Sequence, residues 1–159
     1  MSLVRFDPKS DVRIQTDKIT TSTWSDNTNN LQSVFTSSQQ TFTSATTYSK
    51  SVVGTPVTLT DAASIAVDFS LGNNFIVTLA GNRTLGSPAS ASAGQTGHIY
   101  LVQDGTGSRT VAYGGSWSFQ SGTIPTASTS INSVDVLVYN VRGVSAVDAV
   151  LLKAFSSSS

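Results

Sequence analysis

Short runs in which apolar and polar residues alternate fill the chain beyond Pro56, and pairs of Gly, Asn and Asp separate them. Alternation with a period of two places apolar side chains on one face of an extended strand, because successive side chains point to opposite faces. The run LGNNFIVTLAGNRTL, residues 71–85, shows this most clearly: Phe75, Val77 and Leu79 share one face. Its Asn-Asn and Gly-Asn pairs are turn formers that bound a strand. A chain of such runs is restricted to a β-rich fold.

The composition of the chain favours the same class of fold. Ser and Thr make up about 30% of the 159 residues, and all nine acidic residues are Asp, with no Glu. Ser and Thr favour strands and loops over helix interiors, and Glu is a better helix former than Asp. We therefore expect no extended helices.

Seven short runs with frequent turn signals predict an all-β domain, specifically an antiparallel β-sandwich of the jelly-roll-like type. Two hairpins are expected: VQDGTGSRTVAY, turning at residues 104–108, and VLVYNVRGVSAVDAVLL, turning near Arg142-Gly143. The segments SPASASAGQTG and GGSWSFQSGTIPTASTSINS are expected to be long loops. The candidate strands are residues 57–60, 64–69, 75–80, 98–103, 110–113, 134–141 and 147–155.

The candidate strand at residues 134–141 differs from the others, because both of its faces are largely apolar. Val134, Val136 and Val138 share one face, and Leu137 and Tyr139 lie on the other. A strand that is apolar on both faces is typical of one that is covered on both sides. We expect such cover for this strand.

The first fifty residues have a different composition. Residues 1–18 hold seven charged residues of mixed sign, and Ser, Thr, Asn and Gln dominate from there to residue 50. Large apolar residues are widely spaced in this part, so it buries too little to fold well alone. We therefore divide the chain into an extended N-terminal attachment segment, residues 1–50, and a β-sandwich module, residues 51–159. The candidate docking residues in the attachment segment are Trp24, Phe35 and Phe42.

Charge and cysteine content exclude several classes of function. The net charge is zero and no basic block is present, which argues against nucleic acid as a partner. No basic stretch is followed by an apolar run, so we expect neither a signal peptide nor a membrane span. The chain has no Cys, and His98 is its single histidine. Because usual metal sites combine several such ligands, we expect no metal site and no cofactor.

Enzymatic chemistry has little support in the residue pattern. Paired carboxylates for glycoside hydrolysis would have to come from Asp residues alone. Asp68 and Asp135 fall within candidate strands and are candidates for buried carboxylates, but nothing in the sequence pairs them. No Gly-x-Ser-x-Gly elbow and no phosphate-binding loop is present. We therefore expect the protein not to be an enzyme.

Three aromatic residues near the middle of the module are candidate contacts. Trp117 and Phe119 lie in the Gly- and Ser-rich segment GGSWSFQSG, and Tyr113 precedes it. Such rings stack on the apolar faces of sugars, which would make a glycan-binding platform. The alternative is that they close one end of the sandwich or lie in a subunit interface, where aromatic side chains are enriched.

Three phrases in fixed order, LGNNFIVTLAGNRTL, AGQTGHIYLVQDGTGSRTVAYG and VDVLVYNV, resemble a β-rich module of bacteriophage tail and virion proteins. The resemblance covers about residues 55–155. The segment TSTWSDNTNNLQSVFTSSQQ also resembles N-terminal sequences of phage tail structural proteins. The family supplies no catalytic motif to carry over.

The resemblance implies a non-enzymatic virion component, assembled in the host cytoplasm and located in the phage particle. The favoured hypothesis is a short tail fibre or fibre-like appendage, a homotrimer anchored to tail, baseplate or capsid proteins by its N-terminal segment. One alternative is a capsid decoration (cement) protein. A further alternative is a carbohydrate-binding module that recognises a host cell-surface glycan.

Overall fold

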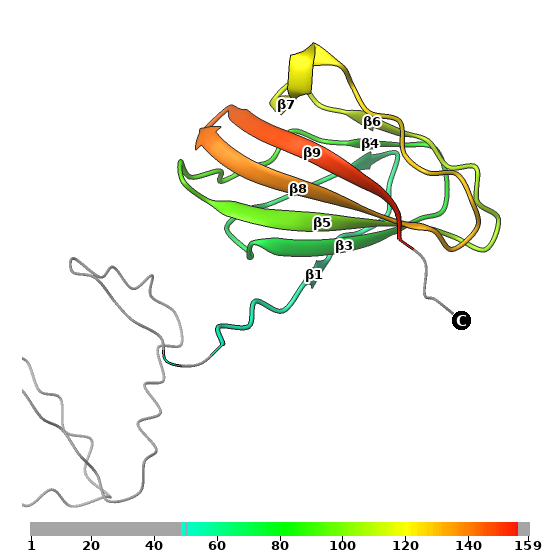
Figure 1. Cartoon of the computed structure of the whole chain (residues 1–159), viewed down its shortest axis with the longest axis horizontal. Coiled ribbons are helices and arrows are strands. Elements are labelled where there is room, and N and C mark those ends of the chain that lie inside the picture. Colours follow the sequence, from blue (N-terminus) through cyan, green and yellow to red (C-terminus); the bar gives the residue numbers. More distant parts are fainter. Residues whose placement is uncertain (1–48, 50, 156–159) are drawn as a thin grey trace, which may run out of the picture. The chain divides into compact units, whose positions relative to one another are not determined.

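The computed structural model describes residue 49 and residues 51–155, which form a two-sheet β-domain (Figure 1). The part described contains no α-helix, only one short 3-10 turn, η1 (Gln120–Gly122). The all-β prediction is therefore confirmed for these residues. The strands are β1 (Val57–Thr58), β2 (Ser64–Ile65), β3 (Asn74–Leu79), β4 (Arg83–Leu85), β5 (Thr96–Gln103), β6 (Val111–Tyr113), β7 (Trp117–Phe119), β8 (Val134–Gly143) and β9 (Ala146–Phe155).

Each of the seven predicted runs overlaps one of these strands, and two strands were not expected. The strand β4 follows β3 after the Gly-Asn turn, and its three residues are too few to show an alternation of their own. The strand β7 lies inside GGSWSFQSG, so the prediction of a continuous loop there is wrong. The flanking Gly and Ser residues are typical of a loop, although Trp117 and Phe119 lie on the same face of this short strand.

Consecutive strands from β1 to β7 alternate between the two sheets. The larger sheet has the order β1-β3-β5-β8-β9-β7, and the smaller sheet has the order β2-β4-β6. The pairs β1–β3, β3–β5, β2–β4 and β4–β6 are all parallel. Parallel neighbours need a long crossover connection, and here each crossover passes through the opposite sheet instead of through a helix. The chain from β1 to β6 therefore winds as a coil of stacked strands.

The prediction of an antiparallel, jelly-roll-like sandwich is wrong in its strand directions. Only the pairs β5–β8 and β8–β9 are antiparallel, so β8 alone runs against the other described strands of the larger sheet. The second predicted hairpin, β8–β9, is confirmed, although its ladder continues to the pair Gly143–Ala146, beyond the expected turn.

The first predicted hairpin does not exist, because β5 and β6 belong to different sheets. The turn itself is present: the Asp104 carboxylate accepts the backbone N–H groups of Thr106 and Gly107 at 3.0 and 2.9 Å. After this turn the Gln103 side chain, and not a strand neighbour, pairs with the backbone N–H and carbonyl of Arg109. Alternation shows which side chains face inward but not which strand is the neighbour, so a crossover and a hairpin look alike.

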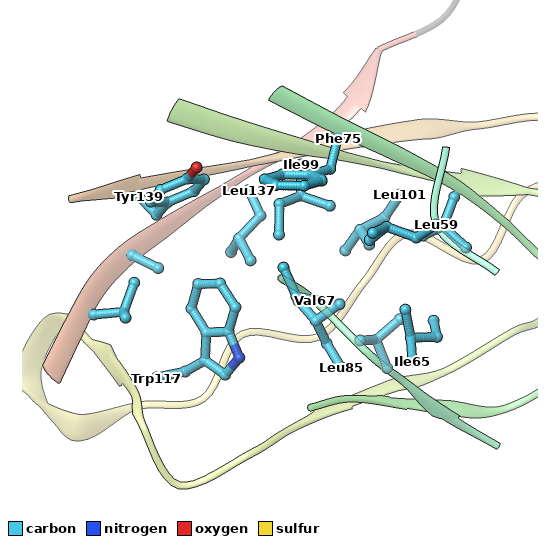
Figure 2. Close-up of a cluster of buried hydrophobic side chains, with 14 of the residues drawn as sticks. Leu59, Ile65, Val67, Phe75, Leu85, Ile99, Leu101, Trp117, Leu137 and Tyr139 are labelled. Atoms are coloured by element: carbon cyan, nitrogen blue, oxygen red, sulfur yellow. The ribbon is translucent and has the colours of Figure 1, made fainter. Parts of the chain in front are cut away.

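The core lies between the inner faces of the two sheets, as Figure 2 shows. An aromatic cluster occupies one end of this core. The Phe69 ring stacks on the Tyr139 ring with 4.5 Å between centroids, and Trp117 meets both rings edge-on at 6.3 Å. Burial of each large apolar side chain contributes about 1.5–3 kcal/mol. The fully buried side chains include Phe75, Ile65, Leu79, Leu85, Ile99, Leu101, Leu137, Val77, Val141 and Val147.

Within the described residues, only one face of β8 is covered. Leu137, Tyr139 and Val141 point into the core, whereas Val138 on the opposite face is 43% exposed. The expected cover on both sides is therefore not supplied by the described part of the chain itself.

A close approach of Asn73, the residue before β3, to strand β5 fixes the end of the larger sheet. The Asn73 carbonyl accepts the Tyr139 hydroxyl at 2.8 Å and the His98 backbone N–H at 3.1 Å. Gly97 lies directly beneath this carbonyl, and a Cβ atom at that position would overlap the carbonyl oxygen.

We expect Gly97→Ala to lower the free energy of unfolding by at least about 2 kcal/mol, because overpacking would displace Asn73 and break its hydrogen bonds. The matched control is Gly105→Ala, since a Cβ there has no heavy atom within 4 Å. The control should stay within about 0.5 kcal/mol of the wild type in urea denaturation. Equal stability of the two variants would contradict the packing described here.

Candidate functional site

The three aromatic candidates of the module lie together at the β6–β7 side of the domain, and their contacts are with the domain itself. Figure 2 shows Trp117 among the side chains of the core, where it is 7% exposed. Its indole N–H donates to the Gly86 carbonyl at 2.9 Å. The rings of Tyr113 and Phe119 meet edge-on with 4.7 Å between centroids, and both are half-buried. Burial of Trp117 leaves little of its ring for stacking on a ligand. That any of the three contacts a glycan or a neighbouring subunit stays a prediction.

Tyr113 occupies an unusual environment for a phenol. Its hydroxyl is buried without a hydrogen-bond partner among the described residues. Burial raises the pKa of this phenol well above its usual value, and the negative charge of Asp135 raises it further. The group therefore stays neutral and packs as an aromatic side chain. The candidate docking residues Trp24, Phe35 and Phe42 lie outside the described residues.

A groove of about 630 Å³ lies beside β7 on the outer side of the larger sheet. Its lining includes Phe119 and Gln120 together with Val138, Asn140 and Val150 from the β8–β9 hairpin. The surface of the groove is mostly apolar. Sequence reasoning did not find it, because its walls come from strands that the topology, and not the order of the chain, brings together.

The described arginines all form ion pairs, which neutralise charge locally. Hydrogen bonds from each guanidinium hold the pKa of the partner carboxyl below its usual value. At neutral pH these carboxyl groups are ionised. The pairs are Arg83 with Asp61 at 2.6 Å, Arg109 with Asp104 at 2.8 Å, and Arg142 with Asp148 at 3.0 Å.

Two of these carboxylates are close enough to influence each other. The charge of Asp104 opposes ionisation of Asp61, but the hydrogen bonds from Arg83 outweigh it and the pKa of Asp61 is lowered. The general acid of a glycosidase is a carboxyl group with a raised pKa. The pKa values of Asp61 and Asp104 are lowered instead, as is usual for carboxylates in structural ion pairs.

The two carboxylates expected inside strands have different settings. Asp135 is 2% exposed and accepts backbone N–H groups from Ser128 at 2.7 Å and Ala154 at 2.8 Å. It therefore joins the loop before β8 to the end of β9, and the prediction of a buried carboxylate is confirmed for it. Asp68 is only half-buried, and it accepts the backbone N–H and the hydroxyl of Ser70.

His98 lies on the outer face of β5, where its ring meets that of Tyr100 edge-on at 4.7 Å. Within the described residues no group of three or more His, Cys, Asp or Glu side chains is placed to hold a metal ion. No helix in that part of the chain is long and apolar enough to cross a membrane.

The geometry defines a class of protein: a two-sheet β-domain whose described carboxylates serve its own turns and ion pairs. Comparison with protein families identifies it further. Residues 55–145, more than half of the chain, match the family model described as "Putative phage tail fibre C-terminal domain", and the chain belongs to this family. No curated protein and no solved structure gives a significant match. The resemblance to phage tail proteins that the sequence carries is thus confirmed.

The ion pairs predict a pH dependence of stability. A carboxyl whose pKa is lower in the folded than in the unfolded chain stabilises the fold above its unfolded pKa, near 3.8, and loses that contribution as pH falls through the folded pKa. We expect the free energy of unfolding to decline as pH falls below about 4.

The variant Asp104→Asn should show a shallower decline in urea denaturation followed from pH 7 to acid, because one such titrating group is removed while the turn keeps an acceptor oxygen. A decline as steep as that of the wild type would contradict the assignment.

Proposed function

We propose that the protein is a non-enzymatic structural subunit of a phage virion, a short tail fibre or fibre-like appendage. In this proposal residues 1–50 attach the subunit to other virion proteins of the tail, baseplate or capsid, and the β-domain projects as part of a homotrimer. Its location is then the phage particle, after assembly in the host cytoplasm. The observation that carries the proposal is membership of the tail fibre family over residues 55–145.

The chemistry of the domain supports a mechanical and not a reactive role. The described arginines pair with aspartates, and the buried Asp135 is used to join two backbone segments. Ion pairs and buried hydrogen bonds of this kind stabilise one arrangement of loops and do not supply a proton donor at neutral pH. A fibre subunit needs such rigidity together with a contact surface.

Two other roles agree with the same fold. A capsid decoration protein would present a similar domain on the head, and labelling of the particle with antibodies against this chain distinguishes head from tail. A host-glycan module would use the groove beside Phe119, whose lining includes Gln120 and Asn140. A glycan array probed with the wild type and Phe119→Ala tests that role, and an absence of binding by the wild type overturns it.

The attachment role of residues 1–50 is tested by deleting them. Because the hydrophobic core lies within the described β-domain, we expect the truncated protein to remain folded by circular dichroism. It should fail to join phage particles in a complementation assay that measures the chain in purified virions. Normal incorporation of the truncated protein would refute the attachment role.

A variant of the full chain with Trp24→Ala, Phe35→Ala and Phe42→Ala provides a second arm. If these rings dock on a neighbouring virion protein, incorporation should fall while the β-domain unfolds at the same temperature. Undiminished incorporation would remove the three residues from the proposed attachment contact.

A further inference from the structure

The outer face of the larger sheet is an apolar surface built from four adjacent strands. Register places side chains of β3, β5, β8 and β9 in rows that cross the sheet. We call this surface the outer apolar face. Its rows are Asn74–His98–Val138–Val150, Ile76–Tyr100–Val136–Leu152 and Thr78–Val102–Val134–Phe155.

These rows contain no Asp, Lys or Arg, and nine of their twelve positions are Val, Ile, Leu, Phe or Tyr. The exposure is substantial for side chains of this type: 43% for Val138, 51% for Val150, 44% for Leu152 and 50% for Phe155. Single exposed apolar residues are ordinary on a protein surface, but a contiguous patch of them marks an interaction site.

Polar residues border the face. At one end the next row is Thr96–Asn140–Asp148–Ser118, and along the β3 edge lie Asn74, Thr78 and Thr58. An apolar centre without charge inside a polar rim is the arrangement found in subunit interfaces. The groove beside Phe119 opens at this rim, so it belongs to the same surface.

We infer that the outer apolar face is the surface through which identical copies of this chain pack against one another. This rests on the proposed assembly role and deepens it, because it names the contact.

The chemistry of the face favours a second copy over other occupants. Transient interfaces are about as polar as the rest of a surface, whereas permanent ones between subunits are more apolar and depleted of charge. A regular sheet also presents a surface that fits another regular sheet, since sheets pack face to face about 10 Å apart. A neutral, regular surface is complementary to a copy of itself.

The size of the face is consistent with the centre of such a contact. Four strands spaced about 4.8 Å apart, over five or six residues rising about 3.3 Å each, cover roughly 350 Å² of flat area. A standard interface buries about 800 Å² on each partner. The rows would therefore supply about half of the contact, and the polar rim would complete it.

The first experiment measures the mass of the full chain in solution by size exclusion with light scattering. The wild type should have a mass of at least two chains of 16.6 kDa each. Val138→Glu and, separately, Leu152→Lys should raise the dissociation constant at least about 100-fold, because each would bury an unpaired charge. The matched control is Val144→Glu, in the β8–β9 turn outside the rows, where the wild-type residue is 78% exposed.

Thermal unfolding of each variant shows whether it is folded, and both face variants place their charges where the single chain already meets water. A monomeric wild type overturns the inference, and so does a folded Val138→Glu or Leu152→Lys that assembles like the control.

A second measurement does not depend on charged variants. Because the chain has no Cys, Val138→Cys introduces a single thiol with little change in volume. At concentrations where the protein is assembled, its reaction with a maleimide should be at least about tenfold slower than after dilution to the monomer. Val144→Cys should react equally fast in both states. Equal rates for Val138→Cys would show that the face stays open in the assembly and would overturn the inference.

The outcome is separable from that of the proposed function. If the face variants dissociate the oligomer but the chain is absent from purified virions, the contact stands and the virion role fails. If the chain is present in virions and its oligomer is indifferent to these substitutions, the virion role stands and the contact is wrong.

Discussion

The contact between the inner faces of the two sheets is the interaction on which the rest of this structure depends. Because strands β1 to β7 alternate between the sheets, neither sheet can form without the other. Each full turn of the chain adds one strand to each of the two sheets. The Phe69–Tyr139 stack and the buried Trp117 close one end of this core. The polar residues then hold the connections in place, through the Asp104 turn, the Asp135 hydrogen bonds and the Tyr139–Asn73 contact.

The same arrangement explains why the surface has its character. Burial of one face of each strand uses half of the positions in the strand and leaves the other half to the outside. In the β8–β9 hairpin the outward residues Val138, Val150 and Leu152 are also apolar, although they are not part of the core of the described domain. A sequence that keeps Val, Leu and Phe at exposed positions carries a free-energy cost in solubility that a contact in the assembly would offset. The chain belongs to a phage tail fibre family, and such a contact would form when the subunits of a fibre assemble.

The candidate site shows the limit of reading single residues. Trp117 and Phe119 look exposed in a Gly- and Ser-rich segment, but β7 pairs with β9 and both rings turn inward. Asp135, by contrast, was recognisable as a buried carboxylate from its apolar neighbours in the sequence. The groove beside Phe119 and the outer apolar face join residues from three or four strands, and no local pattern in the sequence indicates that they meet.

The sequence by itself determined the all-β class, the positions of seven strands and the family, because alternation and turn residues act over a few neighbouring residues. Only the tertiary structure decided which strands are neighbours and in which direction they run. Side-chain alternation is identical in a hairpin strand and in a parallel crossover strand. For this reason the sequence predicts that β5 and β6 pair with each other, whereas in the structure they belong to different sheets. That placement, through register across β3, β5, β8 and β9, also brings scattered apolar residues together on one outer face.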